Sequence, residues 1–290
     1  MPTARIFAAA LEAAASRSLM VIRMLDSAAL TPVAGLSVTR ADEVLSVTID
    51  RPDSLNSLTT SVLAGIAEAM EYAATDPRVK VVRLGGAGRG FSSGAGMSAD
   101  DVSGSGGPGT EIIVQANRAV QAITALPHPV VAVVQGPAAG VGVSLALACD
   151  LVLASDAAFF MLAFTKIGLM PDGGASALVA AAVGRTRAMR MALLAERLPA
   201  ADALAAGLIS AVYPADTFEA EVEKVISGLL AGPAVAFAKT KQAINAATLT
   251  ELQPTLHREL QGQAKLLRSH DFLEGATAFQ QRRTPNFTDR

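Results

Sequence analysis

The stretch GPAAGVGVSLALACD, Gly136–Asp150, is the part of the chain that decides the fold. It follows the apolar run PVVAVVQ and places small residues where a buried strand turns into a helix. Glycine and alanine leave no side-chain bulk on such a turn, so a ligand can reach the backbone and the first free N–H groups of the helix. Those donors, aided by the helix dipole, stabilise negative charge.

A second stretch has the same character. FSSGAGMS, Phe91–Ser98, follows the apolar run VKVVRLGG, so another buried strand ends in a loop of small residues. Either loop alone could equally be a close-packing turn or a phosphate-binding loop. Together the two stretches predict loops that converge on one oxygen atom.

Three motifs, FSSGAG, GPAAGVGVSLALACD and FTKIGLMPDGG, together resemble the enoyl-CoA hydratase/isomerase (crotonase) family. The resemblance runs from about Leu36 to the C-terminus. It implies an α/β fold, a crotonase-like right-handed spiral of ββα units with a helical C-terminal trimerisation region. It also implies that the backbone N–H groups of Ala95 and Val141 hold a thioester carbonyl.

The same resemblance implies a coenzyme A thioester as the substrate, with no other cofactor and no metal. In the family, the segment that reads RPDSLNSL here gives backbone around Ser54 and Leu55 to the coenzyme A slot. A strand-to-helix loop, with Asn56 as a local turn-former, explains that segment equally well. The remaining substrate-binding residues that the resemblance implies are Ser93, Gly94, Gly96, Met97, Gly140, Ser144, Phe164 and Phe279.

The residues at the family's acid–base positions favour isomerisation over hydration. Hydratases of the family carry glutamates where this chain has Ser144 and Phe164, and neither side chain offers the carboxylate that water addition requires. Asp172 instead matches the position used by isomerases that resemble the phenylacetate-pathway ring-epoxide isomerase and Δ3,Δ2-enoyl-CoA isomerases. A 1,3-proton shift needs one base and a stabilised enolate, so we expect Asp172 to be that catalytic base.

Several alternatives stay open at this point. Asp172 is also well placed to cap a helix that starts at Gly173. We expect the Ser144 hydroxyl to hydrogen-bond its own helix backbone. Val141 and Gly96 replace the family's usual glycine and aspartate, which could weaken turnover or change the acyl group that fits. Two other functions compete with the isomerase. These are an enoyl-CoA hydratase-type lyase of fatty-acid oxidation and a catalytically degenerate acyl-CoA-binding paralogue.

Composition narrows the class of protein. Of 290 residues, 51% are hydrophobic and 17% charged, which is typical of a chain with a large buried core. The net charge of −2, the absence of a Lys/Arg run and the absence of Trp argue against a nucleic-acid partner. Apolar windows are too short for a membrane span, and Cys149 is expected to be an inert buried thiol. We therefore expect a cytoplasmic enzyme. The family resemblance, together with an apolar, helical C-terminus, implies a homotrimer or dimer of trimers.

The chain divides into three predicted regions. Residues 1–35 form an N-terminal extension with little order, 36–195 the spiral core and 196–290 a helical C-terminal region. Within the core we expect a hairpin over 36–50, helices over 58–74 and 111–126, and strands over 80–84 and 151–155. The later part is expected to be all helical, with helices over 185–194, 199–206, 218–230, 233–247, 251–267 and 271–283. His128 and Asp150 are expected to have structural roles.

Overall fold

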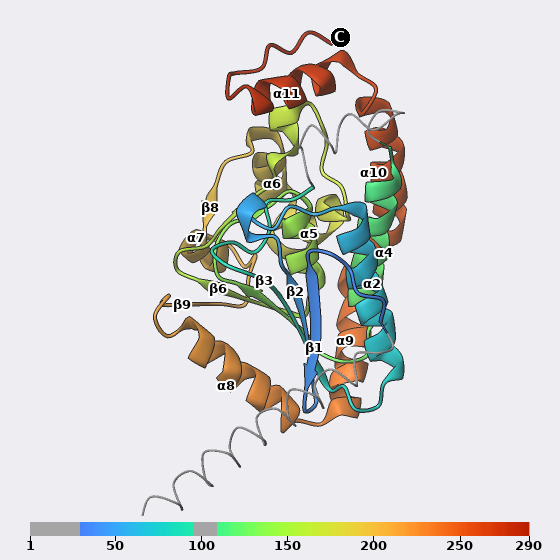
Figure 1. The fold of residues 1–290 in the computed structure, drawn as a ribbon, viewed down its shortest axis with the longest axis vertical. Helices are drawn as coiled ribbons and strands as arrows, with labels where there is room; N and C mark the ends of the chain where they lie inside the picture. The colour runs from blue at the N-terminus through green and yellow to red at the C-terminus, as the bar shows by residue number, and fades with distance from the viewer. Residues whose placement is uncertain (1–29, 96–108, 290) are drawn as a thin grey trace, which may run out of the picture.

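The computed structural model describes residues 30–95 and 109–289. Its centre is a six-stranded sheet in the order β1-β2-β3-β4-β6-β9 (Figure 1). β1 and β2 pair as the predicted antiparallel hairpin, and the other neighbours are parallel. A second sheet has the order β5-β7-β8. The strands are β1 Leu36–Ala41, β2 Val44–Ile49, β3 Val81–Gly86, β4 Val130–Val134, β5 Ala138–Ala139, β6 Leu151–Ser155, β7 Phe159–Met161, β8 Leu198–Pro199 and β9 Ala211–Tyr213.

The helices lie close to their predicted ranges. Two short 3₁₀ helices, η1 and η2, lie outside the predicted ranges. α6 bends at Gly184, where two helices were expected to meet. The helices are η1 Pro52–Ser54, α2 Thr60–Thr75, α4 Glu111–Ala125, α5 Val141–Ala148, η2 Ala163–Ile167, α6 Ala175–Leu194, α7 Ala200–Ala205, α8 Phe218–Leu230, α9 Ala234–Thr248, α10 Leu252–Leu266 and α11 His270–Gln280.

Helices cover both faces of the main sheet (Figure 1). On one face, α2, α4 and α5 bury the larger apolar core, because strand residues such as Val47 and Leu84 point toward them. On the other face, α8 packs Phe218, Val222 and Ile226 onto the sheet. The strands of such a sheet are apolar on both sides, which explains runs such as VVAVV.

The prediction of an all-helical C-terminal third was wrong. β9 comes from that region and pairs with β6 at the edge of the main sheet, and β8 pairs with β7. The segment AVY is only three residues long, so it carried no alternating pattern that would indicate a strand. The C-terminal region therefore completes the sheet as well as supplying helices.

None of the residues of α9 is buried. Polar contacts link this helix to the rest of the protein. Lys241 forms an ion pair with Asp150 at 2.9 Å and donates to the Ile123 carbonyl at 3.0 Å. Asp150 also accepts from the Val130 N–H at 2.7 Å, which confirms its predicted structural role. Within the described part of the chain, no helix combines the length and apolar character that a membrane crossing requires.

Of the predicted N-terminal extension, only residues 30–35 lie within the described range. There, Leu30 and Val33 pack against the larger core. The Asp50 N–H donates to the Gly35 carbonyl at 2.8 Å, which ties this segment to the end of β2. This segment is therefore attached to the core through Leu30 and Val33, while Thr31, Pro32 and Ala34 are exposed.

Candidate active site

The two loops of small residues meet, as predicted. Ser92 and Ala138 form a parallel bridge, and the Ala139 N–H donates to the Ser92 carbonyl at 2.8 Å. Gly94, at φ +90°, comes so close that a methyl group there would lie 2.8 Å from the Ala139 carbonyl oxygen. Only glycine allows this conformation and this contact, so the loops approach backbone to backbone.

Val141 is the first residue of α5, where an amide has no acceptor within the helix. Among the described residues, no side chain caps this end of α5. The Gly140 N–H is already used, because it donates to the Met161 carbonyl at 2.9 Å. On the facing loop, the Leu58 N–H donates to the Gly94 carbonyl. This bond between Leu58 and the loop does not use the Ala95 N–H. The arrangement suits the predicted pair of N–H donors.

The first loop is held by the segment that resembles the coenzyme A slot. The Ser93 N–H donates to the Leu55 carbonyl at 2.8 Å, and its hydroxyl donates to the Ser54 carbonyl at 3.0 Å. Asn56 is more than a local turn-former, since its fully buried amide donates to the Ala87 and Gly90 carbonyls at 2.8 and 2.7 Å. Residues 54–56 therefore fix the position of the loop that carries Ala95.

Asp172 lies in the same region and is buried, with 6% of its surface exposed. Its neighbour Gly173 packs against α5, because a methyl group there would lie 3.2 Å from the Ser144 Cβ and 3.7 Å from the Val141 Cγ1. The Phe164 ring, also buried, reaches Gly140, where a methyl group would lie 3.8 Å from its Cζ. The structure thus brings Asp172, Ser144, Phe164 and Val141 together around the start of α5.

The Asp172 carboxyl has an unusual environment. Gln263 donates from Nε2 to its Oδ2 at 2.7 Å, whereas its buried Oδ1 has no hydrogen-bond partner among the described residues. The pKa of Asp172 is raised to about 7: burial is the main cause, the Gln263 hydrogen bond opposes it, and the negative charge of Glu259 adds to it. A carboxyl group with these properties is able to exchange a proton near neutral pH.

The structure excludes one open alternative for this region and contradicts one prediction. Asp172 does not cap the following helix, because α6 begins at Ala175 and the Glu259 carboxylate accepts from the Gly174 and Ser176 N–H groups at 2.7 and 2.9 Å. The Ser144 hydroxyl does not bond its own helix. It donates to the Asp172 carbonyl at 2.8 Å, since the turn through Gly173 brings that carbonyl within reach.

Sequence reasoning missed Glu259 and Gln263. Both lie on α10 and are 1% exposed. The available signal was their spacing: with Leu252 and Leu256 they fall on the inward face of α10, where polar residues need a partner. Of the other predicted residues, Gly96 and Met97 lie outside the described residues. Phe279 is 63% exposed on α11, so its contact with coenzyme A stays a prediction.

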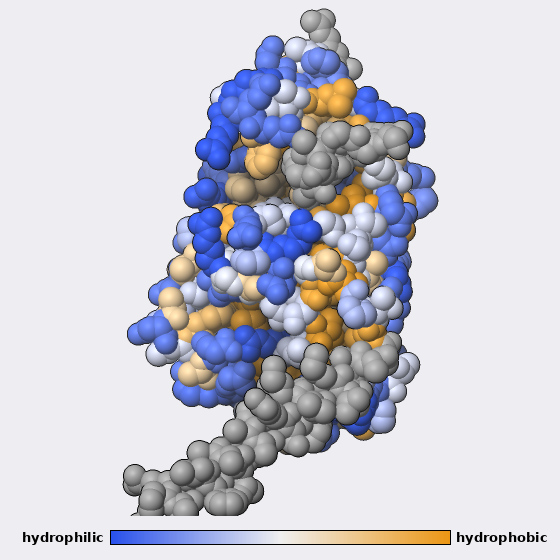
Figure 2. Space-filling model, viewed as in Figure 1, coloured by the Kyte–Doolittle hydropathy of each residue, from blue (hydrophilic) through white to orange (hydrophobic). Residues whose placement is uncertain are grey.

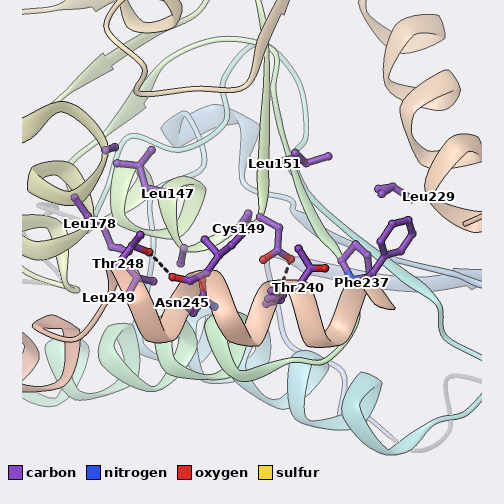
Figure 3. Close-up of a pocket in the computed structure, with 17 residues that line it drawn as sticks. Leu147, Cys149, Leu151, Leu178, Leu229, Phe237, Thr240, Asn245, Thr248 and Leu249 are labelled. Atoms are coloured by element: carbon purple, nitrogen blue, oxygen red, sulfur yellow. Dashed lines mark hydrogen bonds and ion pairs between the residues drawn. The ribbon is translucent and has the colours of Figure 1, made fainter. Parts of the chain in front are cut away.

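A separate cavity of about 430 Å³ lies between α9, α6 and the end of α5 (Figure 3). Its walls are mainly apolar, with Leu147, Leu178 and Phe237 among them, and none of the predicted site residues lines it. Burial raises the pKa of the Cys149 thiol there, and Lys241 pairs with the Asp150 carboxylate. The cavity therefore offers no activated nucleophile or free base.

Comparison with known proteins agrees with this geometry. The profile of the family described as Enoyl-CoA hydratase/isomerase matches residues 39–290. The chain belongs to the enoyl-CoA hydratase/isomerase family. The α/β crotonase fold with ββα units and C-terminal helices, which the motifs predicted, is confirmed.

Relatives in this family carry different names. A probable enoyl-CoA hydratase of Rhodobacter capsulatus is 39% identical over 244 residues, 84% of this chain and 94% of the relative. The 1,2-epoxyphenylacetyl-CoA isomerase of Escherichia coli is 36% identical over 251 residues, 85% of this chain and 95% of the relative. A solved enoyl-CoA hydratase from Mycobacterium avium subsp. paratuberculosis is 77% identical, with a TM-score of 0.84 over 89% of this chain and 100% of that chain. Family membership alone does not separate hydratase from isomerase.

The close approach of the two loops predicts that Gly94→Ala destabilises the protein. Its Cβ would collide with the Ala139 carbonyl, and its positive φ is costly for alanine, so we expect a loss of about 2 kcal/mol in the free energy of unfolding. Urea unfolding measures it. Gly228→Ala is the control, because that exposed glycine in α8 has open space around it and alanine favours helix by about 1 kcal/mol. Equal effects of both variants would contradict the loop contact.

Proposed function

We propose that the protein is an acyl-CoA isomerase that shifts a double bond, from Δ3 to Δ2 of an enoyl-CoA or in a related substrate. The observation that carries this proposal is the buried carboxyl of Asp172 beside the start of α5, whose Oδ1 has no hydrogen-bond partner among the described residues. Its pKa is raised, mainly by burial, to about 7. Asp172 takes a proton from C2 of the acyl group and returns it at C4. The N–H groups of Ala95 and Val141 stabilise the thioester enolate between these two steps.

The surroundings of Asp172 support one-base chemistry rather than water addition. Ser144 and Phe164 stand at the family's two glutamate positions, and neither is a titratable base. The Ser144 hydroxyl is engaged with the Asp172 carbonyl, and the Phe164 ring adds an apolar wall next to Gly140. Moving a proton and a double bond involves no net oxidation, so the proposed reaction requires no cofactor beyond the coenzyme A thioester itself.

Hydration is the competing proposal, favoured by the names of two relatives, the Rhodobacter protein and the 77% identical structure. In that reaction Asp172 would activate the water, because the neighbouring Glu259 carboxylate is already bound to the Gly174 and Ser176 N–H groups. A catalytically degenerate acyl-CoA-binding protein is the third possibility, because Val141 narrows the pocket where the family has glycine. A panel of 3-enoyl-, 2-enoyl- and epoxy-CoA thioesters separates the three.

We expect Asp172→Asn to lower kcat for isomerisation of a 3-enoyl-CoA by about 10²- to 10⁴-fold, because asparagine keeps the size but cannot accept the α-proton. Acyl-CoA affinity should stay nearly unchanged, since both backbone donors remain. Steady-state kinetics and calorimetry measure the two quantities. Asp202→Asn, at an exposed position of α7, is the control. If Asp172→Asn turns over as fast as the wild type, Asp172 is not the base. If the wild type adds water faster than it isomerises, the hydratase proposal is favoured.

The raised pKa of Asp172 also predicts a pH dependence. Only the deprotonated carboxylate accepts a proton, so kcat should rise with pH through about 7. The ordinary pKa of 3.8 applies to the unfolded chain, hence the folded state binds this proton more tightly. The contribution of Asp172 to stability should therefore decrease as pH rises from about 4 to 7, and Asp172→Asn should lack that decrease. If the difference in Tm between the two proteins is independent of pH, the shift is contradicted.

We further propose a homotrimer or dimer of trimers, built with the C-terminal helices. Figure 2 shows apolar surface gathered in patches on the face drawn. α9 has no buried residue, which suits a helix that is covered on assembly. Among the described residues, the exposed large apolar side chains beyond residue 188 are Met189, Leu193, Leu194, Leu204, Val235, Ile244, Leu273, Phe279 and Phe287. Light scattering at micromolar concentration measures the mass, and that of a monomer would contradict the proposal.

A further inference from the structure

α10 places two buried polar side chains, one helical turn apart, against the loop that carries Asp172. Glu259 accepts from the Gly174 and Ser176 N–H groups at 2.7 and 2.9 Å. Gln263 donates to Asp172 Oδ2 at 2.7 Å. Both α10 side chains are 1% exposed, so water does not compete for these contacts. The loop and α10 lie 85 to 91 residues apart in the sequence.

Glu259 performs the capping role that Asp172 would otherwise take. An aspartate just before a helix normally accepts the free N–H groups of the first turn, and those bonds stabilise its charged form. A carboxylate used in this way is a weak base with little freedom to reach a substrate. Because Glu259 binds the Gly174 and Ser176 N–H groups, the Asp172 carboxyl is not drawn into the cap of α6.

Gln263 fixes the direction in which the Asp172 carboxyl points. Its Nε2 holds Oδ2, and its Oε1 accepts from the Met170 N–H at 3.3 Å, so the amide group is bound at both ends. With Oδ2 held, the other oxygen, Oδ1, remains buried and without a partner among the described residues. In the proposed mechanism, Oδ1 is the oxygen that accepts the substrate proton.

We infer that Glu259 and Gln263 are positioning residues for catalysis: Glu259 keeps Asp172 out of the α6 cap, and Gln263 orients it so that Oδ1 is the proton-accepting atom. This inference rests on the proposed isomerase function. Glu259 is the neighbour whose charge acts on Asp172, and Arg258 in turn acts on Glu259. Neither positioning residue is required to touch the substrate.

The two residues affect the titration of Asp172 in opposite directions, which gives a sharp test. Glu259→Gln removes a nearby negative charge and weakens the cap, so the pH at which kcat is half-maximal should fall below its wild-type value near 7. Gln263→Met removes a hydrogen bond that favours the ionised form, so the same midpoint should rise. Each variant should lose about 10- to 100-fold in kcat while KM stays within about twofold, because binding groups are intact and only orientation changes.

Glu251→Gln is the matched control for the glutamate variant, because Glu251 is exposed at the start of α10 and pairs with Arg258. It should leave both kcat and the midpoint unchanged. Circular dichroism confirms that each variant is folded. Variants that shift the midpoint in the same direction, or leave it where it is, would overturn the inference.

Infrared difference spectroscopy gives a readout that needs no turnover. The carbonyl band of the protonated Asp172 carboxyl is assigned by its loss in Asp172→Asn and is followed against pH in each variant. We expect the band to titrate lower in Glu259→Gln and higher in Gln263→Met than in the wild type. If these shifts occur while the wild type isomerises none of the 3-enoyl-CoA thioesters, the contacts of Glu259 and Gln263 with Asp172 stand and the proposed function fails. If the band does not shift, the positioning roles are wrong whatever the activity.

Discussion

The burial of the Asp172 carboxyl is the constraint on which the rest of the site depends. A carboxylate taken out of water loses several kcal/mol of solvation unless its environment replaces it. Here Oδ2 has a partner in Gln263, and Oδ1 has none in the part of the chain that the structure describes. This desolvation cost falls on the Asp172 carboxyl. Around it, the Ser144 hydroxyl holds the backbone, Gly173 turns the chain against α5, and α10 closes the region from the far side.

The two helix N-termini near Asp172, those of α5 and α6, differ in whether a side chain accepts from their free N–H groups. The start of α6 is closed by Glu259, which satisfies its N–H groups and opposes its dipole. The start of α5 has no side-chain cap among the described residues, although Val141 is buried. An uncapped, buried helix start retains its positive potential for a ligand oxygen. The fold thus leaves electrostatic attraction where an enolate oxygen would lie and neutralises it where a base must stay reactive.

Local chemistry made much of this predictable from the sequence. Gly94 and Gly140 indicated two turns of small residues after apolar strands, and periodicity indicated the main strands and helices of the core, though not β5 and β7. What escaped prediction depends on partners distant in the sequence. Asn56 bonds carbonyls more than thirty residues away, Ser144 bonds the Asp172 carbonyl 28 residues on, and α10 contributes from beyond residue 250. β9 gains its strand character only from pairing with β6, since AVY has no pattern of its own.

The long separation between Asp172 and α10 has a consequence for the order in which the molecule becomes functional during synthesis. A nascent chain that has emerged to residue 174 already contains both glycine loops, α5 and Asp172, but the side chain that caps α6 follows 85 residues later. Until α10 docks, the free N–H groups of α6 have Asp172 as their nearest acidic neighbour in the chain. In such a partly made protein the Asp172 carboxyl is free to take the capping position, so we expect the proposed base to reach its uncapped, buried state only when the last helices dock.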